Sequence, residues 1–515
     1  MLDLVLRGGT VVDGTGAEPV RADVGVRDGR IVAPGPAREV VDCTGLVVTP
    51  GFVDLHSHAD FTIRHSPAAE SCLRQGITTI VTGNCGSSPF PSVPGVNETL
   101  GGAGERDTTQ WPSFTAFAES VDEREPGVNV AVLVGHAALR AAVAGSELRD
   151  LTATELAAMC ETLKTLAEEG IHGLSTGLIY APGSFAPTDE VVALATVAAE
   201  AGLLYSTHMR DEGDRLLEAV EEALETARRS GVRLQISHLK AMGPANHGKV
   251  REALQRIHSA RAAGLDVACD VYPYAASSTR LSSRLPDWAL DGGASALVTR
   301  LHEPETRARI RAEVSARIGR TLLPEGTMIA ALSQGPFHRW IGATVAEIAA
   351  ADGAEPVDTV LDLLRDHQGD VWIVNHAMAE EDVETVLQDR LSAVASDGWV
   401  LDTAGGGHPH PRHFGAFARA FAKYHRTRGV VDLADVVRKM SALPAERIGL
   451  RDRGTLTEGR IADVAVFDPQ TFTDVATYEK PLAYATGIAH VLIGGRFAVR
   501  DGALAAQRHG RVLRR

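Results

Sequence analysis

The sequence is poor in cysteine, in positive charge and in long apolar runs. Its five cysteines are odd in number, widely spaced and include no CxxC pair, which favours free thiols in a reducing compartment over a disulfide framework. Asp and Glu outnumber Lys and Arg by 66 to 51, giving a formal net charge of −15. That balance argues against a nucleic-acid or anionic-membrane partner, because both select basic surfaces.

Two kinds of segment are also missing. No apolar run approaches the roughly 18 residues that a membrane-spanning helix needs. The N-terminal run MLDLVLRGGTVVDG lacks the basic-then-apolar layout of a signal peptide. We therefore expect a cytoplasmic protein without a membrane or nucleic-acid partner. With 44% hydrophobic and 23% charged residues, the chain has the composition of a globular protein with a sizeable core.

Four helical stretches end in a glycine that is followed at once by a short apolar strand. These glycines are Gly170, Gly202, Gly231 and Gly264. Glycine closes a helix because it enters the left-handed conformation without a Cβ penalty, and a spacing of about 30 residues matches one βα unit. The pattern predicts an α/β protein with a (β/α)8 TIM-like barrel.

Nine segments are candidates for the eight barrel strands, so one is surplus. The surplus strand is expected around 265–272 or 371–375, and the sequence does not decide between them. The nine candidates are 51–55, 77–83, 128–135, 171–177, 203–209, 232–239, 265–271, 371–375 and 392–396.

The two ends of the chain differ from the middle. Residues 1–49 and 447–515 are rich in short β-type runs punctuated by glycine, which predicts one composite β-sandwich domain built from both termini. The barrel would then occupy 50–446. A charged, helix-biased stretch at 287–336 has no strand of the barrel type, and we interpret it as a helical insertion within the barrel.

Five separate apolar runs each end in, or are soon followed by, a side chain that can bind a metal. In a barrel, the carboxyl ends of the strands meet at one mouth, so these side chains are expected to converge there. Imidazole, thiolate and carboxylate are the ligand set of zinc. Each residue taken alone has an ordinary alternative as a hydrogen-bonded polar residue or a small buried thiol. The set is His56 and His58, Cys85, His208, His238 and Asp397.

Three histidines elsewhere are harder to interpret. With 19 histidines in 515 residues, chance gives about 0.7 HxH motifs per chain. The second motif, His408 and His410, lies in a Gly/Pro-rich loop with no strand before it. His136 closes the run VNVAVLVG, where it either orients the substrate or polarises a carbonyl, or else makes a hydrogen bond behind the site.

The runs around these residues resemble a known family. They are similar to the D-aminoacylases (N-acyl-D-amino-acid deacylases) of the amidohydrolase superfamily, almost over the whole chain, and GNCG is the most specific of them. The matching runs are GFVDLHSHAD, GITTIVTGNCGSSPFP, GLSTGLIYAPGSFAPTDEV, YSTHMRDEG, QISHLKAMG, ASDGW and HPRHFGAFARAF.

The resemblance implies a role for each of these side chains. Cys85, His208 and His238 would bind one zinc ion tightly. His56 and His58 would line a second metal position of weaker occupancy, and Asp397 would be the general base.

The lysines provide an independent check on the thiolate ligand. Related amidohydrolases that act on cyclic amides usually bridge two metals with a carboxylated lysine. Before Lys240 the chain contains only Lys164, which lies in a helical stretch rather than at a strand end. Composition therefore argues against a bridging lysine and leaves Cys85 as the anionic ligand.

The resemblance also implies a clamp for the α-carboxylate of the substrate. Lys240 and Arg412 would form it, assisted by Tyr272 and Ser278, for which Tyr274 and Ser277 are neighbouring alternatives. The expected function is zinc-dependent hydrolysis of N-acyl-D-amino acids to a carboxylate and a D-amino acid. The expected partner is therefore a small-molecule substrate. The alternatives are a dihydroorotase- or hydantoinase-like enzyme acting on a cyclic amide, imide or lactone, and a catalytically inactive binding homologue. The preferred side chain, the acyl group and the choice between monomer and homo-oligomer stay open.

Overall fold

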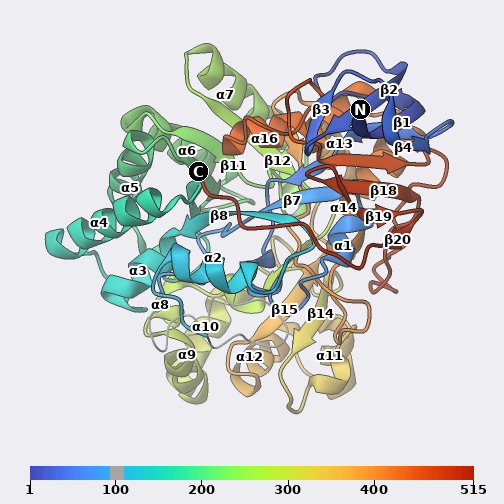
Figure 1. The fold of residues 1–515 in the computed structure, drawn as a ribbon. Helices are drawn as coiled ribbons and strands as arrows, with labels where there is room; N and C mark the ends of the chain where they lie inside the picture. Colours follow the sequence, from blue (N-terminus) through green and yellow to red (C-terminus); the bar gives the residue numbers. More distant parts are fainter. Residues whose placement is uncertain (93–108) are drawn as a thin grey trace.

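Eight parallel strands form the central barrel in the computed structural model, which describes residues 1–92 and 109–515 (Figure 1). Each strand pairs with its neighbour in chain order, and a parallel bridge between Ser57 and Gly398 joins the first strand to the last. The predicted (β/α)8 barrel is confirmed. Its strands are β6 (Phe52–Asp54), β7 (Ile77–Thr82), β8 (Asn129–Gly135), β9 (Gly173–Gly177), β10 (Leu204–His208), β11 (Arg233–Ile236), β12 (Val267–Val271) and β16 (Ser392–Val394).

The surplus strand of the sequence is β15 (Val371–Asn375), which lies outside the barrel. It pairs antiparallel with β13 (Ser277–Arg280) and β14 (Thr327–Leu332) in a separate three-stranded sheet. Every residue of β7 and β8 is buried, as expected for parallel strands covered on both faces. The run of β15 is similarly apolar because it is buried in another sheet, so composition alone could not separate it from the barrel strands.

The outer helices follow the barrel strands. Helix α4 begins with a capping box between Thr152 and Glu155 and ends at Gly170, whose φ is 104°; Gly231 ends α6 with a φ of 74°. These left-handed caps turn the chain back into the next strand. The helices are α1 (Glu70–Leu73), α2 (Phe114–Asp122), α3 (His136–Ala144), α4 (Ala153–Glu169), α5 (Thr188–Glu200), α6 (Leu216–Ser230), α7 (Val250–Ala262), α13 (Glu380–Gln388), α14 (Arg412–Arg419), α15 (Leu433–Met440) and α16 (Ala442–Ile448).

The chain between β12 and α13 carries the small sheet and five α-helices, at the bottom of the view in Figure 1. A hydrophobic cluster of its own, including Leu297, Ile310, Val360 and Ile373, holds this inserted segment together. The helical stretch predicted at 287–336 lies within it, and the exact boundaries of an insertion stay a prediction. The five helices are α8 (Asp287–Leu290), α9 (Gly293–His302), α10 (Pro304–Ser315), α11 (Val345–Asp352) and α12 (Pro356–Asp366).

Strands from both ends of the chain form one nine-stranded sheet beside the barrel. The antiparallel pairing of β5 with β17, in which Val48 faces Val466, joins the two ends. The domain boundaries 1–49 and 447–515 themselves stay a prediction. The strands are β1 (Leu2–Val11), β2 (Val20–Arg27), β3 (Arg30–Val32), β4 (Ala37–Asp42), β5 (Val47–Pro50), β17 (Val464–Phe467), β18 (Ile488–Ile493), β19 (Arg496–Arg500) and β20 (Ala503–Leu504).

The last residues of the chain leave this sheet and return to the barrel. Val512 forms a parallel bridge with Val130 near the start of β8, and the Leu513 amide donates to the carbonyl of Val130. The Leu513 side chain packs in a buried cluster with Val53 and Val81. The C-terminus therefore belongs to the packing of the barrel itself.

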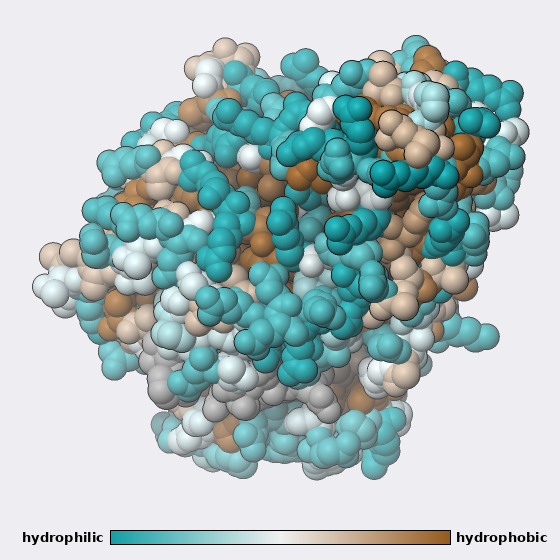
Figure 2. Space-filling view, viewed as in Figure 1, coloured by the Kyte–Doolittle hydropathy of each residue, from teal (hydrophilic) through white to brown (hydrophobic). Residues whose placement is uncertain are grey.

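The surface in Figure 2 is mostly hydrophilic, with hydrophobic residues scattered over it. Among the helices within residues 1–92 and 109–515, none has the length and apolar character required to cross a membrane.

Candidate metal centre and active-site cavity

The six candidate metal-binding and catalytic residues all lie at the carboxyl ends of barrel strands. His208 ends β10, His238 comes two residues after β11, and Cys85 and Asp397 each come three residues after a strand. Loop and strand ends at this edge of a parallel barrel face one mouth. The structure accordingly brings these side chains, together with His56 and His58, into one cluster.

Cys85, His208 and His238 form the first group. The Cys85 Sγ atom lies 3.5 Å from His208 Nδ1 and 3.4 Å from His238 Nε2. All three side chains are buried, and their candidate ligand atoms lie within 4.8 Å of one another. One thiolate and two imidazoles are a donor set that zinc prefers, so the residues present fit this metal.

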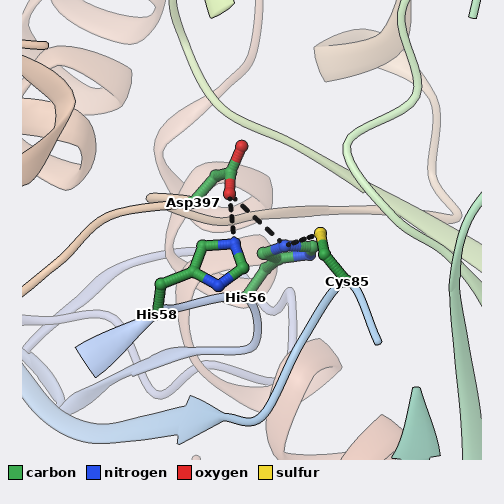
Figure 3. A group of neighbouring side chains, drawn as sticks. All are labelled: His56, His58, Cys85 and Asp397. Carbon is green, nitrogen blue, oxygen red and sulfur yellow. Dashed lines mark hydrogen bonds and ion pairs between the residues drawn. The ribbon is translucent and has the colours of Figure 1, made fainter. Parts of the chain in front are cut away.

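Cys85 also belongs to a second group, with His56, His58 and Asp397 (Figure 3). Its Sγ atom lies 3.3 Å from His56 Nε2. The Asp397 Oδ1 atom lies 3.0 Å from His58 Nε2 and 3.4 Å from His56 Nε2. The same thiol therefore belongs to both groups of candidate metal ligands.

Electrostatics hold the anionic members of the cluster in their charged forms. Burial raises the pKa of Cys85, but the neighbouring His56 and His238 outweigh it and hold that pKa well below its usual range. Burial also raises the pKa of Asp397, and Arg412 together with His58 brings it well below the usual value. At neutral pH the site therefore presents a thiolate and a carboxylate.

Three residues of the cluster have left-handed backbone conformations that non-glycine residues rarely adopt. The φ angles are 53° for Cys85, 35° for His238 and 51° for Asp397. Each such conformation costs about 1–3 kcal/mol and persists only where the surrounding structure holds it. All three follow barrel strands, so the bends aim the side chains into the mouth of the barrel.

Glu212 was not predicted from the sequence; its carboxylate lies beside the imidazoles of His208 and His238, at the ring nitrogens that face away from Cys85. Its Oε1 atom lies 3.0 Å from His238 Nδ1, and its Oε2 atom lies 3.3 Å from His208 Nε2. The same carboxylate is hydrogen-bonded to the Lys240 ammonium, and all of these groups are buried. A carboxylate behind ligating histidines fixes the tautomer and orientation of their rings. The only available signal was an acidic residue four positions after His208.

Asp270 was missed as well, although it is the one acidic residue in the apolar run of β12. Its Oδ1 atom accepts a 2.7 Å hydrogen bond from the backbone amide of His238, and its Oδ2 atom accepts one of 2.8 Å from Gln235 Nε2. The same Oδ1 atom lies 3.5 Å from His56 Nδ1. Asp270 therefore holds the strained turn at His238 and places a carboxylate beside His56.

A cavity of about 1350 Å³ opens beside the cluster, between the barrel mouth and the inserted segment. The residues expected to clamp the substrate all line it: Lys240, Tyr272, Ser278 and Arg412. Arg412 Nη1 donates to Asp397 Oδ2 at 2.7 Å. The Tyr272 ring lies near both cations, 5.6 Å from Lys240 Nζ and 5.0 Å from Arg412 Cζ. Ser278 contributes its carbonyl oxygen, which accepts from Arg412 Nη2 at 3.3 Å.

The histidines outside the cluster have other environments. His136 is fully buried, its Nε2 lies 2.8 Å from Glu190 Oε1, and it is not among the residues lining the cavity. His410 accepts a 3.0 Å hydrogen bond at Nδ1 from the backbone amide of Arg412, and its Nε2 lies 2.9 Å from the carbonyl oxygen of Ala276. The second HxH motif thus holds the loop that carries Arg412, and the structure does not bring it into the metal cluster.

Comparison with known proteins adds independent information. A model of the amidohydrolase family matches residues 39–499. The N-acyl-D-glutamate deacylase of Alcaligenes xylosoxydans xylosoxydans is 39% identical over 520 residues, which cover 100% of this chain and 97% of that protein.

Two solved structures match over the full length of both chains. The N-acyl-D-glutamate deacylase from Bordetella bronchiseptica, complexed with zinc and a phosphonate that mimics the tetrahedral intermediate, has a TM-score of 0.85 and 36% identity. The second is a D-aminoacylase with a binuclear metal centre, in which one metal activates and a second metal attenuates. It has a TM-score of 0.86 and 35% identity.

Proposed function

Because the chain belongs to the amidohydrolase family, in its D-aminoacylase branch, we propose that it is a zinc-dependent hydrolase of N-acyl-D-amino acids. It would cleave the amide bond to give a carboxylate and a D-amino acid. The observation that carries this proposal is the thiol of Cys85 beside His208 and His238, at a cavity that also holds the Asp397–Arg412 pair.

Cys85, His208 and His238 would hold the principal zinc ion, and His56 and His58 would line a second, weaker position. Bound zinc supplies Lewis acidity, which lowers the pKa of water from 15.7 towards about 7 and polarises an amide carbonyl. Asp270 and Glu212 orient the imidazoles from behind through the contacts described above.

Asp397 is the candidate general base. Its carboxylate takes a proton from the attacking water and returns it to the leaving amine nitrogen as the amide bond breaks. In the free protein Arg412 pairs with this carboxylate. A substrate carboxylate that binds Arg412 shares that cation and adds a nearby negative charge, which raises the pKa of Asp397 and makes it a better proton acceptor.

Lys240 and Arg412 would bind the α-carboxylate of the substrate on either side of Tyr272, with Ser278 beside Arg412. Arginine suits a carboxylate because its planar fork donates two parallel hydrogen bonds. Fixing this end of the substrate positions the scissile amide relative to the metal site. His136 would not touch the substrate. Its contact with Glu190 would support the start of α3.

The decisive test is hydrolysis of N-acetyl-D- and N-acetyl-L-amino acids by the purified protein with zinc. We expect release of the free D-amino acid from at least one of the methionine, leucine, glutamate and aspartate derivatives, and little release from the L-series. Turnover of hydantoins or dihydroorotate, with none of the D-derivatives cleaved, would contradict the proposal and identify an enzyme for cyclic amides.

We also propose a cytoplasmic location. All five cysteines are free thiols, and a metal-binding thiolate such as Cys85 needs a reducing compartment to stay available.

A further inference from the structure

A row of buried polar side chains joins the N-terminal end of the barrel strands to the metal centre at the barrel mouth. It begins at Arg447 in α16, continues through Gln235 in β11 and ends at Asp270 in β12. Arg447 is 5% exposed, and Gln235 and Asp270 are 0% exposed. Because bulk water does not reach these side chains, their hydrogen bonds have to come from one another and from the neighbouring chain.

The Arg447 guanidinium lies at the start of the strands. Its Nε atom donates to Gln235 Oε1 at 3.2 Å, and its Nη2 atom donates to the carbonyl oxygen of Leu234 at 2.6 Å. It also pairs with Asp266, which directly precedes β12. Leu234 is four residues before His238, which corresponds to about 13 Å along an extended strand. Arg447 is therefore too far from the metal centre to act on it directly.

The Gln235 amide has a defined polarity between its two partners. An amide carries an acceptor oxygen at one end and a donor NH2 group at the other, whereas a guanidinium only donates. The oxygen therefore faces Arg447, and the NH2 group faces Asp270. Gln235 Nε2 accordingly donates to Asp270 Oδ2 at 2.8 Å. Within residues 1–92 and 109–515 this is the one hydrogen bond that Oδ2 receives.

Asp270 connects this row to two candidate metal ligands. Its Oδ1 atom accepts from the backbone amide of His238 at 2.7 Å. The φ of His238 is 35°, a strained conformation that persists only where neighbouring contacts hold it. The same Oδ1 atom lies 3.5 Å from His56 Nδ1, a buried nitrogen without a hydrogen-bond partner among the described residues. A shift of this carboxylate would therefore disturb one ligand of each proposed metal position.

We propose that Gln235 is a positioning residue of the metal centre. It does not line the active-site cavity, and it acts through Asp270, whose carboxylate it holds in the orientation that supports the turn at His238. Arg447 in turn holds the amide so that its NH2 group faces Asp270. This role rests on the proposed zinc site. Without the donor of Gln235, one oxygen of a buried carboxylate stays unbonded, so the carboxylate shifts towards other donors and zinc binds more weakly.

The test replaces Gln235 by methionine, which has a similar length and no hydrogen-bond donor. We expect the zinc affinity of Gln235→Met, measured by competition with a chelator, to fall by about 10-fold, the lower end of the range for residues behind metal ligands. Asp270→Asn, at the next member of the row, should lose at least as much. Cobalt(II) bound in place of zinc should show an altered visible spectrum in Gln235→Met, because the spectrum depends on the arrangement of the metal ligands.

Gln75→Met is the matched control. Gln75 is 1% exposed, and both ends of its amide are hydrogen-bonded, the oxygen to the Phe417 amide and the nitrogen to the Ser71 carbonyl. It precedes β7, at the end of the strand opposite to the metal ligands. Gln75→Met should leave the zinc affinity and the cobalt spectrum unchanged. A fall in zinc affinity equal to that of Gln235→Met would indicate general loosening of the barrel and would overturn the proposal.

A double variant covers the case in which Gln235→Met does not fold. Arg447→Met added to Gln235→Met removes the guanidinium that has lost its acceptor, while Asp270 still lacks its donor. The double variant should bind zinc about 10-fold more weakly than the wild type. Unchanged zinc affinity in the folded single variant or in the double variant overturns the role of Gln235 and leaves the zinc site intact. A wild-type protein that binds no zinc contradicts the proposed function itself.

Discussion

Glu212 is the residue whose replacement tests the metal centre most sharply. Its carboxylate contacts His208 Nε2 at 3.3 Å, His238 Nδ1 at 3.0 Å and the Lys240 ammonium. Glu212→Gln keeps the shape of the side chain but removes its charge and one of its two acceptor oxygens. The amide has one acceptor oxygen in place of two, so the ammonium and the two imidazole nitrogens cannot all keep a carboxylate oxygen beside them.

Two separate losses follow from this geometry. Loss of a carboxylate behind ligating histidines typically costs about 10–100-fold in metal affinity, which corresponds to about 1.4–2.8 kcal/mol of zinc binding. Lys240, whose side chain is 6% exposed, also loses its ion partner. An uncompensated buried charge costs about 3–5 kcal/mol of folding free energy, in the metal-free protein as well.

A double variant separates the two effects. Lys240→Met added to Glu212→Gln removes the unpaired ammonium, so it should restore much of the stability of the apoprotein while zinc affinity stays low. Zinc affinity is measured by competition with a chelator, and stability by urea unfolding of the apoprotein. Glu222→Gln is the matched control, since it makes the same change at a partly buried glutamate that pairs with Arg210 away from the metal ligands. A zinc affinity of Glu212→Gln within twofold of that of the wild type would refute the reasoning.

Three further predictions address the base, the thiolate and the packing of the barrel. Asp397→Asn should keep its principal zinc by metal analysis while kcat falls by about 10²- to 10⁴-fold, as for loss of a general base; undiminished turnover would remove Asp397 from the mechanism. Cys85→Ser should bind less zinc than the wild type after dialysis, and a full metal complement would exclude the thiolate as a ligand. Leu513→Ala, at a residue 6% exposed, should cost about 2–5 kcal/mol in urea unfolding. Leu148→Ala, at 41% exposure, should stay within about 0.5 kcal/mol, and equal effects would contradict the packing role of the C-terminus.

Local sequence patterns were sufficient to predict the barrel and the place of its chemistry. Short apolar runs, closed by glycines such as Gly170 and Gly231, predict parallel strands alternating with helices, and the structure confirms that architecture. Because parallel strands end at one edge, the residues that follow them had to converge. The motifs around Cys85 and His208 also identified the family, which the comparisons confirm.

Tertiary structure decided what depends on pairing between distant parts of the chain. The apolar run of β15 is compatible with the barrel, and its exclusion comes from antiparallel partners at β13 and β14. The pairing of Glu212 with Lys240 joins positions that no local periodicity links.

The same holds for the state of individual side chains in the site. The left-handed backbone at Cys85 and Asp397 exists because surrounding contacts hold it. Gln235 and Arg447, 212 positions apart in the chain, meet for the same reason: burial and hydrogen-bond pairing are properties of the assembled fold. The amino-acid sequence therefore determined which chemical groups meet at the barrel mouth, and three-dimensional packing determined how each is oriented, charged and partnered.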